Sequence, residues 1–340
     1  MKLCDRLYFL DNLKTFKGHI HTPLATTDPF LYTANMNRSF KARMQRIMDW
    51  AIATRPWSFV MSLISVSVGT LLAAETGSIQ WGWFVLVCIG IVSFHATANI
   101  YNDYFDTLYK VDQPDSPTAR YRAQPLLTGM FTPRQLLAEG SILNLITIAI
   151  GLTLSFCRSF TIFWIGLLGF LACFFYTAGP IKFKYRGLGE FFVFLMWGPL
   201  MFEGAYVVQR QVLSLKVFYL SIPFGILVAL VLLANNIRDI DYDSRQGIKT
   251  ISILLGSRHS FYLYAGLIVA AYLYTGGMVL LGILSPWGLL VFLSLPQAIR
   301  LLKMFTWKIP EAADALTARL DTVFGIFLIV ALILNQAVPL

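Results

Sequence analysis

The sequence predicts an all-α polytopic membrane protein with about nine transmembrane helices. Three observations support this fold class. Apolar residues make up 57% of the chain and charged residues only 13%, whereas an average soluble domain carries roughly 25% charged residues. Apolar runs that reach the roughly 20 residues of a membrane span recur along the chain. Lys and Arg gather in alternate loops, as expected when spans are flanked by a cytosolic face.

Nine apolar segments are long enough to cross a bilayer or nearly so. They are residues 57–74, 81–101, 136–156, 159–179, 190–208, 217–236, 260–280, 283–301 and 320–338.

The basic residues orient these spans. Of the 27 Lys and Arg residues, nine precede the first span and fifteen lie in or beside the loops after even-numbered spans. Only Arg158, Arg210 and Lys216 belong to loops after odd-numbered spans. The positive-inside rule then places the N-terminus in the cytosol. The net charge of +9 thus reflects a basic cytosolic face, which suits a lipid bilayer and an anionic substrate and gives no reason to expect nucleic acid.

Three regions follow from the same pattern. Residues 1–35 have no long apolar run, and we expect a poorly ordered tail. Residues 36–54 place Phe40, Met44, Ile47 and Met48 on one helical face, which predicts either an amphipathic interfacial helix or an extension of the first span. Residues 55–340 form the transmembrane domain.

Two acidic clusters follow the second and the sixth span. The first runs from Asn102 to Asp106 and continues to Asp112, and the second runs from Asn235 to Asp243. Because carboxylates are costly next to lipid, two such clusters at span ends indicate a function. Residues four apart share a helical face, so the inward set is Asn102, Asp106, Asn235, Asp239 and Asp243. On the same helices, Asp103 points about 100° away from Asn102, and Asp241 points about 200° away from Asp239.

Oxygen-only ligands favour Mg²⁺ over softer metals. Mg²⁺ takes one or two protein carboxylates and completes its shell with water or phosphate oxygens. The two clusters, with Asn235 in the inward set, would therefore suit a pair of ions that bridge one diphosphate.

Basic residues near the clusters fit the same anion. Arg120, Arg122, Lys182, Lys184, Arg238 and Lys249 are candidate diphosphate ligands, although ordinary positive-inside anchors have the same composition.

Other candidates lie inside or at the ends of spans. Tyr176 ends the fourth span and can stabilise a cation through its ring. Glu203 is an acid within the fifth span, and it would either meet a substrate hydroxyl or cap a kink at Pro199. His95 and Asn99 precede the first cluster by one to two turns and would line a cavity.

The two clusters resemble the Asp-rich motifs of the UbiA-type superfamily of intramembrane aromatic prenyltransferases. The resemblance extends over about residues 50–338 and includes Arg55 to Phe59, Tyr176 to Pro180 and Gly187 to Glu190. The second motif, with Asn235-Asn236-Ile237-Arg238-Asp239, is most similar to 1,4-dihydroxy-2-naphthoate polyprenyltransferases of menaquinone biosynthesis. Three residues depart from that branch: Lys110 stands where Gly is usual, Arg120 and Arg122 are spaced differently, and Glu203 replaces an apolar residue.

The resemblance implies a central cavity under a cytosolic cap, in a bacterial cytoplasmic membrane. It implies Mg²⁺-dependent transfer of a polyprenyl group from its diphosphate to an aromatic acceptor. Asn102, Asp106, Asp112, Asp239 and Asp243 would hold the metal, and Asp106, Asp239, Asp243 and Tyr176 would serve catalysis. Dihydroxynaphthoate is the expected acceptor.

Two alternatives remain at this point. Another acceptor, such as 4-hydroxybenzoate, keeps the reaction class. A cation-coupled secondary transporter would change the class, but transporters place such groups near the bilayer midplane, whereas these acids fall at span ends.

Overall fold

The computed structural model describes residues 29–120 and 122–338, and these residues are largely α-helical. The chain divides into two units, residues 1–47 and 48–340. Helix α1, Pro29–Thr54, begins seven residues before the amphipathic segment expected at residue 36. The rest of the expected tail, residues 1–28, lies outside the described residues. Phe40, Met44 and Ile47 are exposed, and the interfacial position of this helix stays a prediction.

Each predicted span coincides with helix, which confirms the all-α membrane fold. Among residues 29–120 and 122–338, eight helical stretches are long and apolar enough to cross a bilayer, and α5 is a shorter apolar helix at the place of the fourth span. The nine are η1 with α2 (Pro56–Ser58, Phe59–Ala74), α3 (Trp81–Leu108), α4 (Pro133–Cys157), α5 (Thr161–Thr177), α6 with η4 and α7 (Gly189–Leu195, Met196–Leu200, Met201–Arg210), α8 (Leu215–Arg238), α10 (Ile251–Leu280), η5 with α11 (Pro286–Ser294, Leu295–Trp307) and α12 (Ala313–Ala337). Short elements η2 (Thr118–Arg120), η3 (Phe183–Tyr185) and α9 (Ile240–Arg245) lie between them.

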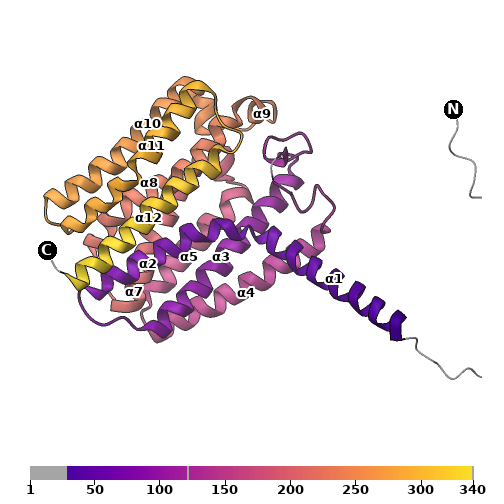
Figure 1. Ribbon diagram of the computed structural model, residues 1–340, viewed down its shortest axis with the longest axis horizontal. Coiled ribbons are helices and arrows are strands. Elements are labelled where there is room, and N and C mark those ends of the chain that lie inside the picture. The colour runs from indigo at the N-terminus through magenta and orange to yellow at the C-terminus, as the bar shows by residue number, and fades with distance from the viewer. Residues whose placement is uncertain (1–28, 121, 339–340) are drawn as a thin grey trace, which may run out of the picture. The chain divides into compact units, whose positions relative to one another are not determined.

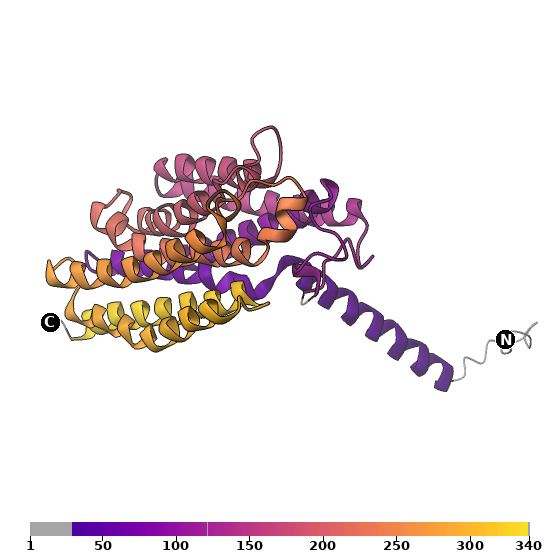
Figure 2. The ribbon, with the colours of Figure 1, turned by 90° about the horizontal axis from the view of Figure 1, so that it is seen from above.

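Helix α8 is the centre of the larger unit. It packs against α10, α12, α6 and η4, and the spans run side by side around it (Figures 1 and 2). Its apolar residues Phe224, Leu227 and Leu230 are fully buried in a core shared with α2, α10 and α12. The most apolar of the predicted spans is thus the most enclosed one.

The fifth span is interrupted in its middle. Residues Met196–Leu200 form a π-helical turn that contains Pro199. Proline cannot donate the usual helix hydrogen bond, and π turns release backbone groups and often occur at functional sites. Within this turn the Trp197 carbonyl accepts a hydrogen bond from the Ser65 hydroxyl at 2.7 Å. The kink that the sequence indicated at Gly198-Pro199 is therefore anchored to α2.

Three loops meet at the end of the bundle that carries the acidic clusters. Tyr242 in α9 donates a hydrogen bond to the Val111 carbonyl at 3.0 Å. Gln113 reaches Gln246 at 3.3 Å, and the Lys249 amide donates to the Tyr185 carbonyl at 3.3 Å. These contacts join the loops after α3, α5 and α9 into a cap.

Candidate active site

The cap and the spans enclose a cavity of about 290 Å³. Its two ends differ in chemistry. One end is polar and is lined by Asn102, Asp106, Asp112, Arg122, Lys184, Asn235, Asp239 and Asp243; the other is apolar and aromatic, with Met61, Phe174, Tyr176, Phe192, Val193, Met196, Trp197, Val228 and Leu232.

The first acidic cluster reaches the cavity from the C-terminal end of α3. Asn102 and Asp106 lie one turn apart, and Asp106 is 2% exposed. Beyond Tyr109 the chain reverses: the Lys110 amide donates to the Thr107 carbonyl, and the Val111 and Asp112 amides donate to the Asp106 carbonyl. This is a Schellman turn, whose first residue after the cap adopts a left-handed conformation. The turn brings Asp112 back to the cavity.

The second cluster reaches the cavity from the C-terminal end of α8. Helix α8 ends at Arg238, and Asp239 separates it from α9. The backbone bonds still connect residues four apart, from the Asp239 amide to the Asn235 carbonyl and from the Asp243 amide to the Asp239 carbonyl. All three side chains therefore line the same cavity, although the continuous helix assumed in the sequence argument is broken at Asp239.

The two acids assigned to other faces lie away from the cavity lining. Asp103 is buried and forms an ion pair with Arg55, and it lies 3.7 Å from Arg122. Asp241 is exposed. The helical-face argument thus separates the acids as the structure does.

The electrostatics of the cluster favour a bound cation. Burial and the neighbouring Asp106 raise the pKa of Asp112 to about 6. Burial and the neighbouring Asp239 raise the pKa of Asp243 to about 7. Burial lowers the pKa of Lys184, but the attraction of Asp106 and Asp112 outweighs it, so the net shift is upward. Like charges that disfavour one another's ionised forms are stabilised by a cation placed between them.

The donor set fits Mg²⁺ without forming a finished metal centre. Within the described ranges, no three Asp, Glu, His or Cys side chains are close enough to be a ready-made site. Instead, Lys184 binds Asp106 at 2.5 Å, and Arg238 binds both Asp239, at 2.6 Å, and Asn235, at 2.7 Å. Mg²⁺ takes only one or two protein carboxylates and fills its shell with phosphate oxygens. One acidic cluster on each side of the cavity is therefore enough to hold Mg²⁺ when a diphosphate supplies the remaining ligands.

The six basic candidates divide into two groups. Arg122 and Lys184 line the cavity, and Arg238 lies beside it on Asp239. Arg120 and Lys249 are exposed, and Lys182 sits over the Tyr109 ring at 3.3 Å. The latter three do not line the cavity, so the structure gives no support to their assignment as diphosphate ligands.

Sequence reasoning overlooked three residues at the polar end. Arg55 lines the cavity and pairs with Asp103. Tyr185 donates a hydrogen bond to Asp106, and Thr177 donates to Asn102 at 3.2 Å. Arg55 and Thr177 lie within motifs that the sequence had singled out, whereas Tyr185 had no signal except its place next to Lys184.

The structure also separates the two candidates within spans. Tyr176 lines the cavity. Glu203 accepts a hydrogen bond from the Ser214 amide at 3.2 Å, where α8 begins. The acidic cluster is at the other end of α8, about 30 Å away at 1.5 Å per residue. Glu203 therefore caps a helix terminus, although the helix is α8 and not the kink at Pro199.

Comparisons with known proteins agree with this geometry. Residues 62–330 match the UbiA prenyltransferase family. The chain is 29% identical over 299 residues to 1,4-dihydroxy-2-naphthoate octaprenyltransferase of Bacillus subtilis, covering 87% of this chain and 94% of that protein. It is 31% identical over 301 residues to UbiA prenyltransferase domain-containing protein 1 of Dictyostelium discoideum, covering 84% and 87%.

Solved structures share the fold. A UbiA homolog from Aeropyrum pernix K1 superposes with a TM-score of 0.65 at 19% identity, covering 83% of this chain and 98% of that one. A UbiA homolog from Archaeoglobus fulgidus bound to GPP and Mg²⁺ gives 0.58 at 15%, covering 84% and 99%. With the family match over most of the chain, the chain belongs to the UbiA prenyltransferase family and is a membrane-embedded transferase.

Proposed function

We propose that this prenyltransferase moves a polyprenyl group from polyprenyl diphosphate to 1,4-dihydroxy-2-naphthoate, as in menaquinone biosynthesis, in an Mg²⁺-dependent reaction. One observation carries the proposal: two acidic helix ends face a single cavity whose opposite end is apolar and aromatic. An amphipathic donor with a diphosphate head and an isoprenoid tail matches that division.

The polar end is suited to the diphosphate. Asn102, Asp106, Asp112, Asp239 and Asp243 would hold Mg²⁺, which when bound neutralises the charge of the leaving diphosphate. Lys184 and Arg122 line the same end and supply hydrogen-bond donors to phosphate oxygens. Tyr185 fixes the orientation of Asp106. These residues stabilise the negative charge that develops as the carbon–oxygen bond breaks.

The apolar end is suited to the prenyl chain and the ring. Val193, Val228 and Leu232 form an apolar wall, and Tyr176 lies at the level where α5 ends next to Thr177. An electron-rich ring carbon attacks C1 of the prenyl group as diphosphate leaves. With dihydroxynaphthoate attacked at the carbon that carries the carboxylate, the carbon–carboxylate bond then breaks, carbon dioxide leaves, and its electron pair restores the aromatic ring. Tyr176 shields the allylic cation from water and stabilises it through its ring.

The relatives support the acceptor assignment. The Bacillus subtilis protein named above is a dihydroxynaphthoate enzyme by name. The alternative acceptor, 4-hydroxybenzoate, would use the same donor site, so an assay that offers each acceptor separately must distinguish the two. We propose that the acidic end and the N-terminus face the cytosol, because the basic loops gather at that end. The membrane we propose is the bacterial cytoplasmic membrane.

The test uses purified protein in nanodiscs with Mg²⁺ and labelled polyprenyl diphosphates of several chain lengths. Dihydroxynaphthoate and 4-hydroxybenzoate are offered separately, and products are identified by chromatography and mass. We expect a prenylated, decarboxylated naphthoquinol. Prenylation of hydroxybenzoate alone would overturn the acceptor assignment, and label that never leaves the diphosphate with either ring would overturn the proposed reaction.

A further inference from the structure

A buried network of polar side chains lies beneath the polar end of the cavity. The Ser58 hydroxyl donates to the Arg55 carbonyl at 2.8 Å. With its only proton engaged, this hydroxyl accepts from His95 Nε2 at 3.1 Å. His95 Nε2 therefore carries the ring proton, and Nδ1 accepts from the Ser62 hydroxyl at 2.8 Å. Ser62 in turn accepts the indole proton of Trp197 at 3.0 Å.

The network fixes Trp197 at two points. Its indole nitrogen donates to Ser62, and its carbonyl, within the π-helical turn, accepts from Ser65. The His95 ring meets the indole edge-on, with centroids 5.0 Å apart, and packs on its other side against Phe59 at 5.4 Å. Both His95 and Trp197 line the cavity, and their polar atoms are turned to the serines. The floor of the cavity therefore presents aromatic rings.

The depth of this floor suits an aromatic acceptor. His95 precedes Asn102 by seven residues on α3, which places it about 10 Å below Asn102 along the helix. With the diphosphate bound at the polar end, the prenyl C1 would lie just beneath it, and a reacting ring carbon would approach C1 to about 3–3.5 Å. The distance that remains between the prenyl C1 and His95 would accommodate the long axis of a bicyclic ring.

A hydrogen-bond acceptor lines the same wall. The Asn99 amide donates through Nδ2 to the Thr54 carbonyl at 2.9 Å and to Ser58 at 3.1 Å, which fixes the identity of its oxygen. Asn99 lines the cavity, and across the described part of the chain no hydrogen bond to Asn99 Oδ1 is formed. This oxygen is available to a ring hydroxyl.

We infer that Trp197 is a specificity-determining residue that contacts the aromatic acceptor, and that His95 and Ser62 are positioning residues that hold its indole. The inference rests on the proposed function and adds the place of the acceptor. A polar network inside a membrane is stable only when its members are all satisfied. Simple packing of α2 against the fifth span would need no such network. Its arrangement is explained by the need for one fixed ring orientation.

The test compares Michaelis constants for the two substrates in W197A, W197F, H95L and S62A. We expect W197A to raise the acceptor KM about tenfold, as loss of an aromatic contact would, with the diphosphate KM unchanged. W197F retains a ring and should recover most of the affinity. H95L and S62A should also raise the acceptor KM, by a smaller factor. The double variant H95L/W197A should have the same acceptor KM as W197A, because His95 acts through the indole.

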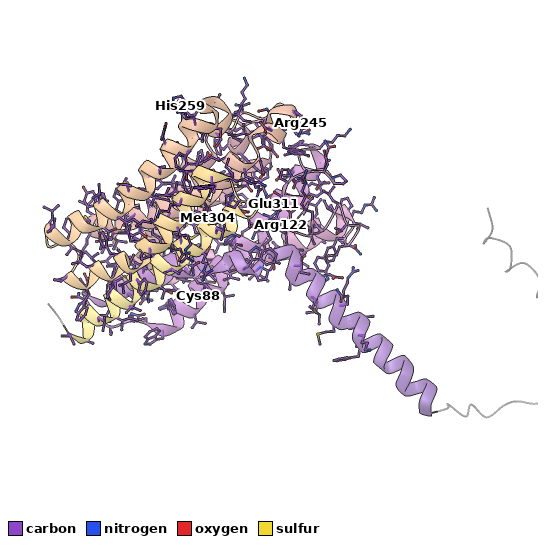
Figure 3. The ribbon with its side chains drawn as sticks, turned by 45° about the horizontal axis from the view of Figure 1, so that its top comes forward. Cys88, Arg122, Arg245, His259, Met304 and Glu311 are labelled. Carbon is purple, nitrogen blue, oxygen red and sulfur yellow. The ribbon has the colours of Figure 1, made fainter. Side chains whose placement is uncertain are left out.

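Matched controls come from the periphery. W307F and H259L alter an exposed tryptophan and an exposed histidine, and His259 lies at the edge of the molecule (Figure 3). Both should leave each KM unchanged. If W197A raises both KM values alike, or leaves the acceptor KM as it is, the inference is overturned. If the wild type uses a different ring, the acceptor assignment fails and the KM comparison is made with that ring. If no ring is prenylated, both proposals fall.

Discussion

Lys110 is a lysine at a backbone position whose conformation favours glycine. Its φ of 59° lies in the left-handed region, which suits the glycine usual at this point and costs other residues about 1–2 kcal/mol. The Schellman turn forms nevertheless, because the Val111 and Asp112 amides both bond to Asp106. The turn is therefore formed with a lysine in a left-handed conformation, under backbone strain.

We expect K110G to raise the free energy of unfolding by about 1 kcal/mol, because glycine adopts this φ without strain. Thermal unfolding in detergent measures the change. K110A is the matched control, since it removes the same charged side chain and keeps the strain. Equal midpoints for K110G and K110A would show that the charge, and not the backbone, determines the stability here.

The pair Asp243 and Asp241 tests the site at the same scale. Both belong to α9, but Asp243 lines the cavity and Asp241 is exposed. D243N should lower kcat by about 10²–10³, the usual loss when one charge-stabilising group is removed. D241N should stay within about twofold of wild type. Steady-state rates with saturating Mg²⁺ measure both, and similar losses in the two variants would refute the assignment of the ligand face.

At the scale of elements, the contact between α8 and the π turn positions Trp197. Gly225 of α8 packs against Gly198, and a Cβ on Gly225 would meet the Phe194 carbonyl oxygen at 2.9 Å and the Gly198 Cα at 3.0 Å. Both obstacles are backbone atoms, which cannot rotate away. The two helices are therefore joined at a close glycine contact that the sequence gave no reason to pair.

G225A should destabilise the protein by about 1–3 kcal/mol through overpacking. G266A in α10 is the control, because nothing lies within 4 Å of a Cβ there, and alanine is the better helix former. Thermal midpoints of the two variants should move in opposite directions. An unchanged midpoint for G225A would mean that the contact is looser than described.

Span positions were predictable because apolar length is a strong signal, and α8 illustrates this well. The positions at which helices are interrupted were harder to predict from the sequence. The break at Asp239 and the φ of 76° at Gly256 within α10 depend on how neighbouring loops approach. The expected span at 260–280 begins just after Gly256, so the apolar pattern located the part of α10 that follows the kink and missed the residues before it.

For the whole molecule, the sequence predicted which acids share a cavity but not which cations accompany them. The four-residue spacing of Asn102 and Asp106, and of Asn235 and Asp239, follows from helix geometry alone. The pairing of Lys184 with Asp106 depends on the loop after α5, and that of Arg55 with Asp103 depends on how the turn before η1 lies against α3. Such contacts join residues 48 to 78 positions apart, beyond the reach of local periodicity.

In the proposed mechanism, one cavity uses Mg²⁺ to release diphosphate from a prenyl donor. The most direct measurement is prenyl transfer by the purified wild type with Mg²⁺, then in excess EDTA, then with Mg²⁺ restored, alongside D106N and D239N. From this mechanism we expect transfer to stop in EDTA, to return with Mg²⁺, and to fall by about 10²-fold or more in each variant at any Mg²⁺ concentration. Full turnover in EDTA, or wild-type rates in both variants, would contradict it.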